Sequence, residues 1–209
     1  FSSTTLLVGR DAANVDPFSV STTQLFPLGT KLLYGDRAYR YVFTGGTVAA
    51  GKLLASPAHI AHHTNCLVIN ADAAVLDGVA YSHAVGSRAI CIDTAGDTDL
   101  TADQYAEGYL LVNDAQGEGQ MLKIRTHKAH NHGNDPSVVI ETYDPVTTTL
   151  VKNATQCSLI ANPYKDVVTA PQDEVGAVVA ASAIAMADDR YGWAVVSGPA
   201  AILADSTLV

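Results

Sequence analysis

The fold class of this chain is decided by residues 108–125, Gly-Tyr-Leu-Leu-Val-Asn-Asp-Ala-Gln-Gly-Glu-Gly-Gln-Met-Leu-Lys-Ile-Arg. Two runs typical of strands, residues 108–112 and 120–125, flank a turn that is rich in Asn, Asp and Gly. In the second run Met121, Lys123 and Arg125 alternate with Leu122 and Ile124, which predicts a strand with one face in water. The stretch therefore predicts a β-hairpin.

Short runs of the same kind follow one another along the rest of the chain. Residues 31–34 and 38–43 flank Gly35-Asp36-Arg37 and predict a second hairpin, with Tyr39, Tyr41 and Phe43 on one aromatic face. We expect further strands at residues 52–55, 66–69, 87–94, 137–143, 157–160, 166–170, 176–180, 191–197 and 200–204, separated by Gly, Asn, Asp and Pro. About 11–13 short antiparallel strands predict an all-β chain, folded as a compact barrel or sandwich.

At most one or two short helices are expected. Residues 56–63 could form one or two helical turns, with Ser56 as the N-cap and Pro57 at the first helical position. Residues 100–104 predict a turn or a short helical piece. The Ala-rich residues 180–187 could be a short helix in place of a strand, because periodicity does not decide so short a run.

The chain carries no strong domain linker. Residues 1–23 are rich in Ser, Thr and Asp and weakly periodic, so we interpret them as an extended N-terminal arm that becomes ordered against a neighbour. Residues 24–209 are interpreted as the β-rich domain, with a division into two subdomains left open.

Composition and charge argue against several classes of protein. The chain has 12 basic and 21 acidic residues and a net charge of −9, without a basic run, so we expect no nucleic-acid partner. No apolar run approaches the roughly 18–20 residues of a membrane helix, and the first residues do not resemble a secretory signal, so no membrane partner is expected. Cys66, Cys91 and Cys157 each lie among apolar residues, which predicts buried, reduced thiols and folding in a cytoplasm.

The motifs of common enzymes are missing. No Gly-x-Ser-x-Gly nucleophile elbow and no phosphate-binding loop is present, although Gly51-Lys52 contains the Gly-Lys pair. Gly117-Glu118-Gly119 is better interpreted as a hairpin turn than as a phosphate cradle, because the glutamate would repel a phosphate. We therefore predict a protein that is not an enzyme, without catalytic or cofactor-binding residues.

Three clusters have some of the residue types that bind metal ions. They are His59, His62 and His63; His127, His130 and His132; and Asp93, Asp97 and Asp99. The first cluster would share one face of a helix, but no carboxylate completes a His-Glu-x-x-His site. The acidic cluster lacks the closing glutamate of a calcium loop. We predict no metal site, and metal binding by either histidine cluster stays open as an alternative.

Seven segments of the chain form a recognisable series in their order and spacing. They are residues 24–30, 63–65, 100–114, 117–124, 158–164, 191–193 and 198–200. Together they resemble a family of virion structural proteins from marine tailed phages. The resemblance runs from about residue 24 to the C-terminus and departs from the family in residues 130–135 and in the Ala-rich stretch before Tyr191.

The resemblance implies a place in a phage particle. Its first implication is a capsid decoration (cement) protein, made in the host cytoplasm, which binds the major capsid protein on the outer surface and stabilises the shell. A head spike, tail or fibre component that contacts the host surface is the alternative. Local threefold axes of a capsid would suit a homotrimer, and the acidic charge suits the outside of a container of nucleic acid.

Overall fold

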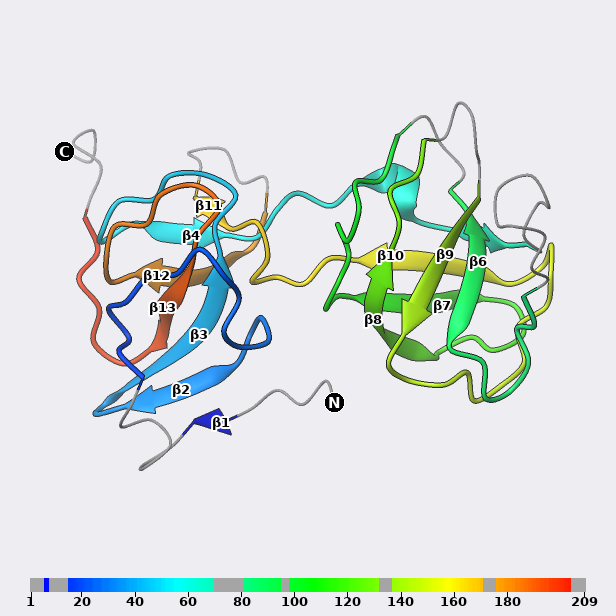
Figure 1. Ribbon diagram of the computed structural model, residues 1–209, viewed down its shortest axis with the longest axis horizontal. Coiled ribbons are helices and arrows are strands. Elements are labelled where there is room, and N and C mark those ends of the chain that lie inside the picture. Colours follow the sequence, from blue (N-terminus) through cyan, green and yellow to red (C-terminus); the bar gives the residue numbers. More distant parts are fainter. Residues whose placement is uncertain are drawn as a thin grey trace. The chain divides into compact units, whose positions relative to one another are not determined.

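The computed structural model describes residues 6–7, 15–69, 81–94, 98–131, 137–170 and 176–203. These residues form 13 strands, β1 to β13, and a single 3-10 turn, η1 (Ala61–His63). Figure 1 shows the strands along the chain. The prediction of an all-β chain is confirmed.

The chain divides into two compact units. Unit 1 comprises residues 59–162, and unit 2 comprises residues 2–58 together with residues 163–209. Unit 1 is therefore a continuous insertion between two segments that build unit 2. All seven histidines belong to unit 1, which has twelve acidic and five basic residues, against nine and seven in unit 2.

Unit 1 is a closed six-stranded barrel, with its strands in the order β10-β5-β6-β9-β8-β7. All neighbouring strands are antiparallel. The strands are β5 (Cys66–Val68), β6 (Ala89–Asp93), β7 (Tyr109–Asp114), β8 (Met121–His127), β9 (Ser137–Thr142) and β10 (Gln156–Ile160).

The hairpin predicted for residues 108–125 is β7–β8, in which Leu110 pairs with Leu122. Leu122 and Ile124 are buried in the barrel, whereas Met121 and Arg125 are exposed, as the alternation predicts. The hairpin prediction is confirmed, and burial of the Leu and Ile side chains inside the barrel supplies its main stabilisation.

A strap of residues 98–108 runs beside the end of β8 and leads into β7. Leu100 and His130 exchange two backbone hydrogen bonds, and Glu107 N–H donates to the Ile124 carbonyl. At Gly108 a Cβ atom would collide with the backbone carbonyl of Ile160. Only glycine therefore lets the strap approach β10 this closely.

Unit 2 is an open seven-stranded sheet with the order β1-β2-β3-β13-β12-β4-β11. Figure 1 shows β2, β3, β13 and β12 following one another in this sheet. The strands are β1 (Leu6–Leu7), β2 (Lys31–Tyr34), β3 (Arg37–Phe43), β4 (Leu53–Ala55), β11 (Val168–Thr169), β12 (Val178–Ser182) and β13 (Tyr191–Ser197). β1 is parallel to β2, and the other neighbours are antiparallel.

Alternate residues of this sheet enter two separate cores. Tyr41 and Trp193, which pair directly across β3 and β13, lie in the first with ring centroids 5.0 Å apart. Their neighbours Val42 and Ala194 lie in the second. The aromatic face predicted for the hairpin of β2 and β3 is confirmed, because Tyr39 and Tyr41 are buried and Phe43 packs against them.

One local prediction is confirmed in part and two are wrong. Residues 61–63 form η1, but residues 56–60 are not helical, and the residue before η1 is Ile60 in place of the predicted N-cap Ser56. The Ser56 N–H bonds the Ala177 carbonyl and continues the pairing of β4 with β12. The alternative of a helix at residues 180–187 fails because residues 180–182 belong to β12. Residues 200–203 form no strand, although Leu203 N–H bonds the Gly51 carbonyl, and residue 204 lies outside the described residues.

The described part of the expected N-terminal arm belongs to unit 2 and packs against the rest of it. Ser21 and Tyr191 exchange two backbone hydrogen bonds. The Phe18 ring lies 5.9 Å from the guanidinium carbon of Arg37. Residues 15–23 thus pack against the sheet at β3 and β13.

Candidate functional site

The first histidine cluster is not the helical face that its spacing predicted. η1 is only three residues long, so His59 lies before it, outside any helix or strand. His59 is exposed, whereas His63 is fully buried. His62 lies within η1, but its side chain is outside the described part of the structure.

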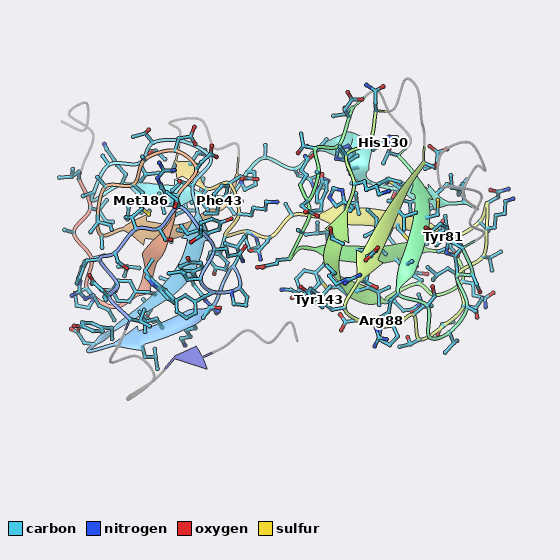
Figure 2. All side chains as sticks on the ribbon, viewed as in Figure 1. Phe43, Tyr81, Arg88, His130, Tyr143 and Met186 are labelled. Carbon is cyan, nitrogen blue, oxygen red and sulfur yellow. The ribbon has the colours of Figure 1, made fainter. Side chains whose placement is uncertain are left out.

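The second histidine cluster begins at the end of a strand and continues beyond it. His127 is the last residue of β8 and is buried, and His130 is buried beside the strap. The His130 Nε2 atom lies 2.7 Å from the hydroxyl of Thr94, which is also buried. Figure 2 shows His130 at the end of unit 1 opposite Arg88 and Tyr143. His132 lies outside the described residues.

One histidine from each cluster meets the same tyrosine of the strap. The Tyr105 hydroxyl lies 2.6 Å from Nδ1 of His63, and the Tyr105 N–H donates to Nε2 of His127 over 3.0 Å. Tyr105 is 3% exposed and belongs to the core of unit 1. We call these three residues the Tyr105 clamp; it joins η1, the strap and β8.

Carbonyl partners fix the hydrogens of both imidazoles. His127 Nδ1 lies 2.9 Å from the Lys128 carbonyl, and His63 Nε2 lies 3.3 Å from the Thr98 carbonyl. A carbonyl only accepts, so each of these two nitrogens donates. His127 Nε2 accepts from the Tyr105 N–H, so the His127 ring is neutral. All four nitrogens of the two rings are engaged within the protein.

The Tyr105 hydroxyl keeps its proton beside His63. Burial raises the pKa of Tyr105 well above its ordinary value, and the nearby Cys66 raises it further. The phenol is therefore neutral at neutral pH and shares a hydrogen bond with Nδ1 of His63. The clamp is a satisfied polar network inside an apolar barrel, and a metal ion could bind these rings only by displacing its hydrogen bonds.

The remaining candidate groups do not converge either. Asp93 is the last residue of β6, and Asp99 is exposed and accepts a hydrogen bond from Asn131; Asp97 lies outside the described residues. Among the described residues no three His, Cys, Asp or Glu side chains are placed to hold a metal ion. Gly117 and Gly119 have positive φ angles of 94° and 88° in the β7–β8 turn, which confirms their interpretation as turn glycines.

Unit 2 carries a different kind of candidate site, an exposed apolar surface. Leu53, Val178 and Val196 come from the neighbouring strands β4, β12 and β13, and each is more than a third exposed. They line one hollow of about 300 Å³. A second hollow of about 310 Å³ shares Val195 and Ala200 with the first.

Hydrophobic residues dominate the second hollow as well. It contains Leu203 and Phe18, and its single charged residue is Arg37. We call the two hollows together the apolar surface of unit 2. Exposed contiguous apolar surface of this kind marks contact sites for other proteins.

Sequence reasoning missed both features. The histidines were singled out, but Tyr105 was not, because its partners lie 42 and 22 positions away along the chain. The apolar surface combines residues from β4, β12, β13 and the segment after β13. One feature of the sequence could have indicated this surface. Two consecutive residues at the end of β13 are apolar, and of these Val195 is buried whereas Val196 is exposed.

Comparisons with known proteins add no relative. A scan of protein-family models found no match, and searches of curated proteins and of solved structures found none. Among the described residues no helix has the length and apolar character needed to cross a membrane.

Proposed function

We propose that the chain is a structural protein of a phage particle, a capsid decoration (cement) protein that binds the outer surface of the shell. The observation that carries this proposal is the apolar surface of unit 2. Leu53, Val178 and Val196 lie on three neighbouring strands, and no charged residue lines the hollow that they share, which suits the core of a contact with another protein.

The uneven charge of the two units supports the same proposal. Unit 1 carries most of the acidic excess, so it suits a solvated position above a shell. Unit 2 is nearly balanced in charge and holds the apolar surface, so we assign the contact with the major capsid protein to unit 2. A homotrimer on local threefold axes is part of the proposal.

The number of copies in a purified virion tests the place in the particle. A decoration protein should be found in numbers on the order of hundreds, as capsid symmetry demands. About a dozen copies or fewer would instead indicate the head spike, tail or fibre alternative. Absence of the chain from purified virions would contradict both. Quantitative mass spectrometry of the particles gives this number.

A binding experiment tests the assigned surface. Shells assembled without the chain are incubated with wild-type protein or with Val178→Asp, which places a carboxylate on the apolar surface. We expect Val178→Asp to lower the bound copies at least about tenfold, because a buried unpaired charge is costly at an interface. Met121→Asp, at a half-exposed site in unit 1, is the matched control and should bind as wild type.

Equal binding by both variants would contradict the assignment of the contact to unit 2. Native mass spectrometry tests the trimer separately. A monomer alone at micromolar concentration would count against the trimer but not against attachment of the chain to the shell.

A further inference from the structure

Two of the three cysteines face each other across a strand pair of the barrel. Cys66 of β5 and Cys157 of β10 are direct partners in the antiparallel ladder, and both side chains are fully buried in the core of unit 1. Direct partners in such a ladder have Cα atoms about 4.5–5.5 Å apart and side chains on the same face. That separation lies within the range of about 4.4–6.8 Å that a disulfide spans.

In the closed barrel these thiols are reduced and unreactive. Burial, together with the neighbouring Cys66, raises the pKa of Cys157 to about 12, so almost no thiolate exists at neutral pH. Cys91 is also buried, but its ladder partner in β9 is Val139. The facing pair is therefore distinct from the third cysteine.

The strand that carries Cys66 is the most weakly held strand of the barrel. β5 has two paired positions with β10 and two with β6, whereas β6 with β9 and β7 with β10 have five each. Strands with few pairs open locally more often than the body of a sheet. Opening of β5 would bring both thiols into water, where the pKa of each thiol returns to its ordinary range.

We propose that Cys66 and Cys157 form a cross-strand disulfide that latches β5 to β10 when the protein meets a small disulfide oxidant. The thiolate of one cysteine attacks the oxidant, which forms a mixed disulfide and releases one thiol. The second cysteine, as its thiolate, attacks the mixed disulfide and releases the other thiol. Two protein thiols lose their protons and two electrons, and the oxidant is reduced to two thiols.

The latch has a direct structural consequence. The new bond links β5 to β10 covalently, across one of the two shortest ladders of the barrel. Most of the residues of unit 1 lie between the two cysteines in the sequence. The two thiols stay reduced in a reducing cytosol and form the disulfide in an oxidising medium. The inference depends on the barrel alone and stands or falls separately from the proposed function.

The experiment incubates the full-length protein with oxidised glutathione at mildly alkaline pH, with and without sub-denaturing urea. We expect a mass loss of two hydrogens, one remaining alkylatable thiol at Cys91, and a proteolytic peptide pair joined through Cys66 and Cys157. Urea that opens β5 without unfolding the barrel should accelerate the reaction. Cys91→Ala is the matched control and should form the same bond.

Hydrogen exchange supplies the second measurement. The amides of Val68 and Ile69 bond to Thr155 and Cys91 and report on β5. Their exchange should slow at least about tenfold on oxidation and recover with a reductant, while the Val42 amide of unit 2 stays unchanged. A bond that includes Cys91, a stable glutathione adduct, or accessible but unlinked Cys66 and Cys157 in urea would overturn the proposal.

Discussion

Asp166 of unit 2 is a partly buried carboxylic acid, and its burial disfavours the charged form. Burial raises its pKa above the ordinary value, and Asp189 raises it further, while Lys165 has the opposite effect. Its backbone has a φ angle of 53°, in the left-handed region that asparagine tolerates better than most residues. Asparagine can therefore replace this residue without backbone strain and without a charge.

The sign of the pH effect follows from the raised pKa. The folded state binds the proton of Asp166 more tightly than the unfolded state, so stability falls as the pH rises from about 4 through the raised pKa. At pH 7 the ionised side chain costs free energy. Asp166→Asn should therefore stabilise unit 2 at pH 7, by less than about 1 kcal/mol because water screens the exposed part of the group.

Urea unfolding followed by the fluorescence of Trp193, which lies in the core of unit 2, measures this change. The gain should shrink below about pH 4, where aspartate is protonated in both states. The exposed Asp188→Asn is the control and should shift stability by less than about 0.5 kcal/mol. A destabilised Asp166→Asn protein at pH 7 would show that the carboxylate has a favourable partner.

The strap of residues 98–108 is the element whose stability depends most on the Tyr105 clamp. Tyr105→Phe removes the hydroxyl that hydrogen-bonds His63 Nδ1 and leaves this buried nitrogen without that partner. We expect unit 1 to lose about 1–3 kcal/mol, the cost of an unsatisfied buried polar group. Hydrogen exchange of barrel amides such as Leu110 and Leu159 measures the loss.

Tyr109→Phe is the matched control for the strap. Tyr109 lies in β7, is only half-buried, and its ring faces the Lys123 amine at 5.0 Å. Its hydroxyl can remain in water, so removing it should change the exchange of the same amides little. Equal effects of the two substitutions would mean that the clamp adds no stability beyond ordinary aromatic packing.

At the scale of elements, sequence periodicity was sufficient wherever burial alternates along one strand. Leu122 and Ile124 against Met121 and Arg125 show this, because the two-residue period of a strand is local. The Ser56-Pro57 signature did not begin a helix, because Ser56 continues the pairing of β4 with β12 through its bond to Ala177, far along the chain, which no local signal shows.

The candidate site was less predictable than the strands. The pairing of Cys66 with Cys157, like the meeting of His63 and His127 at Tyr105, depends on the order in which strands close the barrel. No local pattern encodes that order, since each strand could pair with several others of similar length and composition. The residue types were visible in the sequence, but their partners were not.

Because unit 1 is inserted into unit 2, we predict that the two units differ in their ability to fold alone. Unit 1 is one continuous segment with a closed barrel and its own core, so residues 59–162 should fold alone. Unit 2 needs both of its segments, because β3 from the first pairs with β13 from the second. Residues 1–58 alone should therefore remain unfolded.

Both fragments can be produced and compared with the full chain by amide NMR. Residues 59–162 should give dispersed signals that overlay those of unit 1 in the full protein, and residues 1–58 should give the narrow dispersion of an unfolded chain. Joining residues 58 and 163 with a short Gly-Ser linker should restore unit 2, because β4 and β11 on either side of the insertion already pair through Ala55 and Val168. Unfolded residues 59–162, beside a folded unit 2 in the linked protein, would mean that the barrel needs unit 2 and that the insertion is not autonomous.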